Sequence, residues 1–221
     1  MAAVSQELTY DSIASAADAE CLSIMGGLYE DGGTLILLGP GTGFWPHFRT
    51  SSEMQDGAPH PVDRWSTRVL GALADTLNAE AIFPFGGPPY QPFLRWAMAT
   101  GRAWQSPAGM LVHDEAGLMV SYRGALRWDA KIALSAPPDA PPCVTCDGQP
   151  CMTACPVDAL SAETGYDVAA CHAYLDTEAG QDCMTQGCRA RRACPVSQRF
   201  DRAPEQSALH MQSFHPVGRP T

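Results

Sequence analysis

The chain has 221 residues, of which 45% are hydrophobic and 17% charged. This composition argues against general disorder and allows one large domain or two small ones. The formal net charge of −10 argues against a nucleic-acid partner, because affinity for nucleic acid comes mostly from cationic contacts with phosphates. No apolar run reaches the roughly 18 residues that cross a bilayer, and residues 1–12 lack the basic n-region of a secretory signal. We therefore expect a cytoplasmic protein with no membrane partner.

Helical and extended patterns alternate along the first 134 residues. Residues 12–25 have apolar positions at helical spacing and end at Gly26-Gly27, and residues 34–38 (TLILL) read as a buried strand. A longer helix is predicted over 60–77, where Pro61 suits a first turn. The remaining predictions are a strand at 81–85, a helix at 92–100 and a hairpin over 109–123.

This interleaving predicts an α+β layer fold for a first domain, residues 1–134. The segment 135–142 (SAPPDAPP) is a proline-rich linker, because proline continues neither a helix nor a central strand. A cysteine-rich second domain is expected at 143–200, followed by a tail at 201–221.

Eight of the nine cysteines fall in two groups that each end in Cys-Pro. The first reads CVTCDGQPCMTACP and the second CHAYLDTEAGQDCMTQGCRARRACP. In a reducing compartment such clustering favours metal or redox chemistry over disulfides. A zinc site remains an alternative, since Cys143 and Cys146 form one of the two Cys-x2-Cys pairs that it needs. Zinc leaves Cys151 and both Cys-Pro cysteines without a role.

Two [4Fe–4S] clusters use all eight cysteines. In two-cluster ferredoxins the cysteine before proline binds the cluster of the opposite group. If each Cys-Pro cysteine binds the cluster of the other group, one cluster lies on Cys143, Cys146, Cys151 and Cys194. The other falls on Cys155, Cys171, Cys183 and Cys188. The distal spacing is looser than in compact ferredoxins, so a single-cluster protein with a degraded second site is a further alternative.

Other residues admit both a functional and a structural interpretation. Five arginines (Arg189, Arg191, Arg192, Arg199 and Arg202) either form a docking patch for an acidic partner or compensate cluster charge. The aromatic, Gly- and Pro-rich stretch 83–93 (FPFGGPPYQPF) suits a rigid wall against a planar cofactor, or a tight buried loop. Its candidate cofactor contacts, together with one arginine of SYRGAL, are Phe85, Gly86, Gly87, Tyr90 and Arg123.

With these motifs in place, the cysteine-rich third resembles the ferredoxin module of epoxyqueuosine reductases and reductive dehalogenases. Cys171 in CHAYL, Gly187-Cys188 and Cys194-Pro195 follow the order of that module. HPVDRW and SPAGMLVHDEAGLMVSYRGAL are similar to segments of cobalamin-processing proteins of the cobalamin C type. The resemblance implies a nitroreductase-like α/β layer domain followed by a small bacterial-ferredoxin-like iron–sulfur domain.

The resemblance also implies a corrinoid cofactor, with flavin as the alternative. The proton-donating aspartate of epoxyqueuosine reductases has no counterpart in Phe85-Gly86-Gly87-Pro88-Pro89, so queuosine chemistry is not expected. The sequence therefore predicts a redox protein that passes single electrons through two clusters to a cofactor or substrate in the first domain. The alternatives are a non-catalytic electron carrier that docks a redox partner protein, and a zinc-stabilised binding module.

Overall fold

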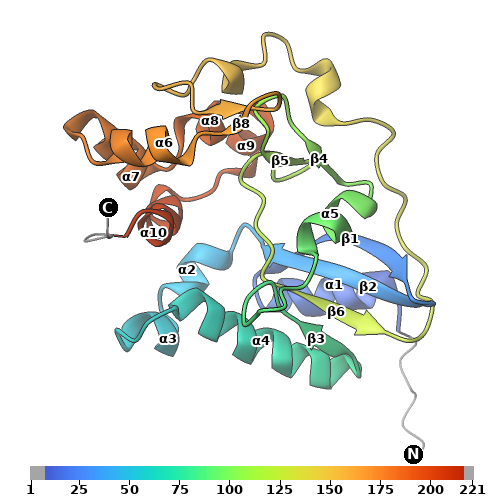
Figure 1. The fold of residues 1–221 in the computed structure, drawn as a ribbon. Helices are drawn as coiled ribbons and strands as arrows, with labels where there is room; N and C mark the ends of the chain where they lie inside the picture. The colour runs from blue at the N-terminus through green and yellow to red at the C-terminus, as the bar shows by residue number, and fades with distance from the viewer. Residues whose placement is uncertain (1–7, 217–221) are drawn as a thin grey trace, which may run out of the picture. The chain divides into compact units, whose positions relative to one another are not determined.

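The computed structural model describes residues 8–216, which form a mixed helical and sheet structure of the α+β class. It divides into two compact units (Figure 1). The first comprises Met1–Arg102 and Ser121–Pro137, and the second comprises Ala103–Val120 and Pro138–Thr221. Across residues 8–216, no helix has the length and apolar character that crossing a membrane requires.

The first unit is built on a four-stranded antiparallel sheet. Its strands lie in the order β1 (Leu22–Glu30), β2 (Gly33–Pro40), β6 (Gly124–Trp128) and β3 (Glu80–Ile82). All eight residues of β2 are buried, which explains why its apolar run does not alternate with polar residues. The predicted strand at 34–38 is thus confirmed, and that at 81–85 is confirmed at its first two residues.

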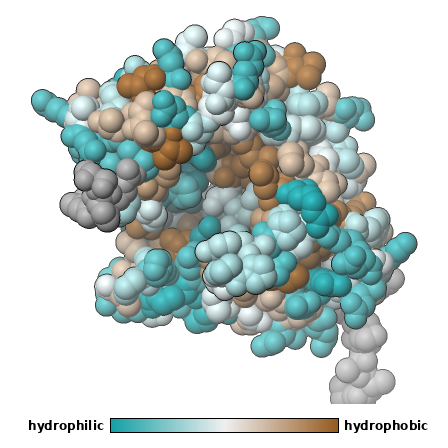
Figure 2. Space-filling model, in the orientation of Figure 1, coloured by the Kyte–Doolittle hydropathy of each residue, from teal (hydrophilic) through white to brown (hydrophobic). Residues whose placement is uncertain are grey.

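Helices cover both faces of this sheet (Figure 1). On one face lie α1 (Tyr10–Ala19) and α4 (Pro61–Leu77), which pack against each other and against the strands. The predicted helix at 60–77 is confirmed, with Pro61 in its first turn. On the other face α5 (Phe93–Ala99) packs against β1 and confirms the predicted helix at 92–100. Hydrophilic side chains cover the outer surface around α3 (Ser52–Gln55) and α4 in Figure 2.

An aromatic cluster packs the N-terminal part of α4 into the core. Trp65 is fully buried and meets Phe44 and Phe48 edge to face, with ring centroids 5.1 and 6.1 Å away. Both phenylalanines belong to the short helix α2 (Phe44–Phe48). Such contacts add about 0.5–1.5 kcal/mol each to the free energy of burying the rings.

Two sequence predictions are wrong at the level of elements. The helix predicted over 12–25 ends at Ala19, and residues 22–30 form β1 instead. A close approach favours glycine within this strand: a side chain on Gly26, whose φ is +130°, would meet the Thr100 side chain at 2.7 Å. Of the hairpin predicted over 109–123, the structure has the turn, closed by an antiparallel bridge between His113 and Gly117. The strand β5 (Leu111–His113) pairs instead with β4 (Ala103–Gln105), and residues 124–128 form β6, which the sequence did not suggest.

The second unit consists mainly of short helices (Figure 1). After the 3-10 turns η1 (Pro142–Thr145) and η2 (Pro150–Met152) come the two-residue strands β7 (Leu160–Ser161) and β8 (Gly165–Tyr166). The remaining helices are α6 (Val168–Leu175), η3 (Glu178–Gly180), α7 (Gln181–Gln186), α8 (Arg189–Ala193), α9 (Pro195–Phe200) and α10 (Pro204–Phe214). The expected tail at 201–221 therefore contains a helix, α10, which packs against α7. Residues 217–221 lie outside the described part of the chain.

Residues 103–120 belong to the cysteine-rich unit, although the sequence placed them in the first domain. Val112 and Leu118 share a buried apolar cluster with Leu160, Ala190 and Val196. Hydrogen bonds fasten the same segment: Leu118 N–H donates to Ser197 Oγ at 2.9 Å, and Arg191 Nη1 donates to the Leu118 carbonyl at 2.9 Å. Residues 103–120 thus share one buried core with the cysteine-rich segment.

Candidate metal centres

Four cysteines line one cavity of the second unit: Cys143, Cys146, Cys151 and Cys194, here called the first cysteine set. The cavity has a volume of about 290 Å³, roughly ten times the 30 Å³ share of one water molecule. Its walls include Val112 and Leu118. This set combines three cysteines of the proximal run with the last cysteine of the chain.

The other four cysteines line a separate cavity of about 160 Å³ in the same unit. They are Cys155, Cys171, Cys183 and Cys188, here called the second cysteine set. Leu175, Met211 and Phe214 contribute apolar walls. The two cavities are thus lined by the same two groups of four cysteines that result when Cys155 and Cys194 are exchanged between the proximal and distal groups.

Local backbone geometry explains how Cys194 leaves the group that is nearest in sequence. Residues before proline avoid the helical region, and Cys194 has an extended conformation (φ −66°, ψ 122°) between α8 and α9. Cys188 lies at the start of α8, directly after Gly187, whose φ of +89° favours glycine. A side chain on Gly187 would meet the Ser207 side chain of α10 at 2.7 Å.

The electrostatics of the thiols follow the same grouping. Burial raises the pKa of Cys143, and the negative charges of Cys151, Cys194 and Cys146 raise it further. Burial likewise raises the pKa of Cys171. A hydrogen bond from Tyr166 lowers this pKa, and the other sulfurs of the second cysteine set raise it. Thiols with a raised pKa lose their protons when they bind a metal, because a metal ligand must be deprotonated.

The donor set fits a polynuclear cluster. Within residues 8–216, no three Cys, His, Asp or Glu side chains converge as ligands of a single metal ion. Each cysteine set instead surrounds a cavity, and a [4Fe–4S] cube takes four thiolates from its four corners. The backbone N–H of Ala159 donates to Cys155 Sγ at 3.3 Å, the type of hydrogen bond that tunes cluster potentials.

The arginines around these cysteines are engaged within the unit. Arg189 Nε lies 2.7 Å from Asp182 Oδ2, and Arg192 pairs with the same carboxylate. These contacts lower the pKa of Asp182. Arg202 donates to the Met119 carbonyl at 3.1 Å, and Arg199 lines the cavity of the first cysteine set. The side chains therefore hold the fold around the cavities and place positive charge there.

Three histidines make close polar contacts within the second unit. His113 is fully buried, and its Nδ1 accepts a hydrogen bond from the Glu115 N–H. His172 Nδ1 lies 2.6 Å from His215 Nδ1, and His215 Nε2 lies 2.9 Å from Asp176 Oδ1. These contacts tie the end of α10 to α6, beside the second cysteine set.

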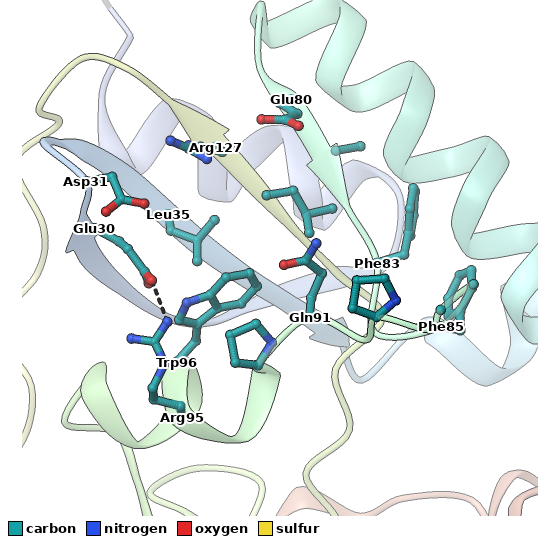
Figure 3. Close-up of a pocket in the computed structure, with 16 residues that line it drawn as sticks. Glu30, Asp31, Leu35, Glu80, Phe83, Phe85, Gln91, Arg95, Trp96 and Arg127 are labelled. Atoms are coloured by element: carbon teal, nitrogen blue, oxygen red, sulfur yellow. Dashed lines mark hydrogen bonds and ion pairs between the residues drawn. The ribbon is translucent and has the colours of Figure 1, made fainter.

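The first unit contains a larger cavity of about 490 Å³ (Figure 3). Three of the five residues that the sequence singled out as cofactor contacts line it: Phe85, Gly86 and Gly87. Tyr90 is 67% exposed and does not belong to the lining. Arg123 also lies outside it, where its Nη1 is 3.3 Å from Asp63 Oδ1 and burial lowers its pKa.

Several lining residues were missed by the sequence analysis because they come from distant segments. Glu30 ends β1, Arg127 lies in β6, and Arg95 and Trp96 lie in α5. Pairing across the sheet sets Arg127 beside both Leu35 and Glu80 on one face. No pattern in the sequence links these positions, and only the strand register brings them together.

Comparison with protein-family models, with curated proteins and with solved structures gave no match for this chain. The site geometry therefore carries the functional argument by itself.

Proposed function

We propose that this chain is an iron–sulfur redox protein that carries two [4Fe–4S] clusters, one on each cysteine set. The clusters supply single-electron transfer to a cofactor or substrate held by the first unit. The observation that carries this proposal is the pair of cavities, each lined by four cysteines drawn from both halves of the cysteine-rich sequence. A set of four thiols around an apolar cavity is the ligand arrangement of such clusters.

The surrounding residues set the conditions for electron transfer. Apolar side chains such as Leu160 and Leu175 line the cavity of the second cysteine set, and burial is one of the factors that fix a cluster potential. The Arg189–Asp182–Arg192 group and the Ala159 N–H provide nearby charge and hydrogen bonding. These residues stabilise the negative charge that an added electron brings.

The finer proposal is a corrinoid-dependent reductase with a nitroreductase-like first unit and a ferredoxin-like second unit. It is supported by the sequence resemblance and by the cavity of about 490 Å³ beside residues 85–87, a volume in the roughly 300–1,000 Å³ range of ligand sites. A flavin is the alternative cofactor.

A non-catalytic electron carrier is the second candidate, and one observation favours it. Val144 and Met152, neighbours of the first cysteine set in sequence, are 72% and 38% exposed. Apolar side chains around a redox centre suit the docking of a redox partner protein.

The two candidates differ in what the reduced protein does without a partner. Full-length protein is reduced anaerobically with dithionite, desalted, and mixed with hydroxocobalamin or FMN while the visible spectrum is followed. The reductase proposal predicts reduction of about two equivalents of hydroxocobalamin per chain, one electron from each cluster, and about half of that in Cys151→Ser. If neither hydroxocobalamin nor FMN oxidises the clusters, the function is that of a non-catalytic electron carrier.

A further inference from the structure

The cavity of the first unit has one polar wall and one aromatic wall. The polar wall is a row across the sheet, with Arg127 of β6 paired in register with Glu80 of β3. The aromatic wall includes Phe83 and Phe85, whose ring centroids lie 5.2 Å apart. Figure 3 shows Trp96 projecting from α5 toward Leu35, on the side of the cavity away from Phe83 and Phe85. Such a combination of apolar surface and a few polar groups is typical of small-molecule sites.

Two buried polar atoms at this cavity have no hydrogen-bond partner: Glu30 Oε2 and Trp96 Nε1. Trp96 is only 6% exposed. The other oxygen of Glu30 is occupied, since Arg95 Nη2 lies 2.6 Å from Oε1. Figure 3 shows the Glu30 carboxylate and the nitrogen edge of the Trp96 indole on the same side of the cavity, next to Arg95. Buried polar groups almost always have partners, so this acceptor and this donor are available for a ligand.

The chemistry of the two atoms restricts the ligand. An indole N–H only donates, and an ionised carboxylate only accepts. The ligand must therefore offer an acceptor and an N–H or O–H donor close together. A carboxylate or phosphate has no donor and would meet the negative charge of Glu30, Asp31 and Glu80. An ammonium ion has no acceptor for the indole and would meet Arg95 and Arg127.

We propose that this cavity recognises a neutral amide, with Glu30 Oε2 accepting from its N–H and Trp96 Nε1 donating to its carbonyl. The aromatic wall favours a planar ligand or the edge of a macrocycle. This inference deepens the proposed function, on which its choice of ligands rests, because a corrinoid carries primary amides and a flavin carries a cyclic imide. The amide is the chemistry that the two cofactors share.

Matched pairs of probes test the amide directly and separate the two sources. Dicyanocobinamide is compared with dicyanocobyrinic acid heptamethyl ester, and lumiflavin with 3-methyllumiflavin. In each pair the second compound keeps the carbonyl and loses the N–H. Binding to the full-length holoprotein is measured by calorimetry and by quenching of tryptophan fluorescence. We expect the parent of one pair to bind about ten-fold more tightly than its blocked analogue, the effect of one hydrogen bond to a charged group.

Variants assign the two contacts. Glu30→Gln should reduce the preference for the parent compound to less than about three-fold, because a neutral amide also pairs with an ester. Trp96→Phe keeps the ring and should weaken parent and analogue by about the same factor, since both retain the carbonyl. Leu94→Ala is the control, because Leu94 lies on α5, is 61% exposed and does not line the cavity.

Equal binding of parent and analogue in both pairs, or no binding of either parent at 100 μM or below, would overturn the proposal. Iron and sulfide content, determined on the same samples, tests the clusters independently. A chain without clusters that still discriminates the amides would refute the proposed redox function and leave the amide site standing.

Discussion

Removing one hydroxyl beside the second cysteine set should shift one cluster potential and leave the other unchanged. Tyr166 of β8 forms a hydrogen bond with the Cys171 sulfur, which lowers the pKa of that thiol against the larger, raising effect of burial. Burial, this hydrogen bond and the neighbouring cysteine sulfurs raise the pKa of Tyr166. Its ring stacks on Phe214 with centroids 6.1 Å apart, so Tyr166→Phe keeps the packing and removes only the O–H donor.

The magnitude follows from the free energy of one hydrogen bond. Its net value is about 0.5–1.5 kcal/mol, and about 1.4 kcal/mol corresponds to 59 mV for one electron. An added electron makes the sulfur a better acceptor, so the hydrogen bond favours the reduced state. Tyr166 is 44% exposed, and solvent replaces part of the lost interaction. We expect Tyr166→Phe to lower one midpoint potential by about 20–60 mV.

The assay is an anaerobic redox titration followed by electron paramagnetic resonance. Tyr174→Phe is the matched control, because Tyr174 lines the same cavity while its hydroxyl donates to the Ala179 carbonyl at 2.9 Å. The control should leave both potentials within about 10 mV of wild type, since no hydrogen bond to sulfur is lost. A rise in potential, no shift at all, or equal shifts of both clusters in Tyr166→Phe would refute the reasoning.

Four further substitutions test the two cysteine sets, a close backbone contact and a buried ion pair. Cys155→Ser should impair the cluster of the second set and Cys194→Ser that of the first, each lowering iron from about eight to about four per chain, as measured by iron analysis and electron paramagnetic resonance. Gly117→Ala should destabilise the holoprotein towards urea by about 1–3 kcal/mol, because φ is +57° and the new Cβ would lie 2.5 Å from a backbone nitrogen. Arg68→Met removes the hydrogen bond that holds the pKa of the buried Glu53 carboxyl at about 2. Urea unfolding at pH 7 should show that the free energy of unfolding falls by about 1–2 kcal/mol. This value is reduced because Arg68 is half exposed.

Each of these substitutions has a control or an outcome that would contradict its prediction. Gly71→Ala is the control for Gly117, since its Cβ meets nothing within 4 Å in α4, and equal stability of the two variants would contradict the steric argument. Because the folded pKa of Glu53 lies below its ordinary value, its contribution is full above about pH 4.5 and disappears as the pH falls toward 2. A deficit in Arg68→Met that is independent of pH over this range would be incompatible with that linkage. Loss of the first cluster alone in Cys155→Ser would refute the crossed sets.

Local signals predicted the elements that local chemistry determines. Pro61 and an apolar stripe at helical spacing predicted α4, and a continuous apolar run predicted β2. The sequence missed β1, because residues 13–24 are apolar at helical spacing. Pairing with β2 overrides this pattern, and the backbone at Gly26 lies close to Thr100, which follows α5. Residues 103–120 were placed in the wrong unit for a similar reason: Val112 and Leu118 pack against Leu160, Ala190 and Val196, which lie far along the chain.

The two sites differ in how far the sequence reveals them. The cysteine sets follow from a rule about Cys-Pro, in which a backbone restriction at one residue turns its thiol toward the other group. The cavity of the first unit has no such rule. Glu30 and Trp96 are 66 positions apart, and neither residue type suggests a site when read alone. Only strand register and helix packing show that both residues line the same cavity.

The central claim is tested most directly by metal analysis of the full-length protein purified anaerobically. Iron, acid-labile sulfide and zinc are determined per chain, together with the electron paramagnetic resonance spectrum after reduction. The two cysteine sets predict about eight iron and eight sulfide per chain, with four thiolates for each cube, and no stoichiometric zinc. Protein that contains stoichiometric zinc and no iron would contradict the account.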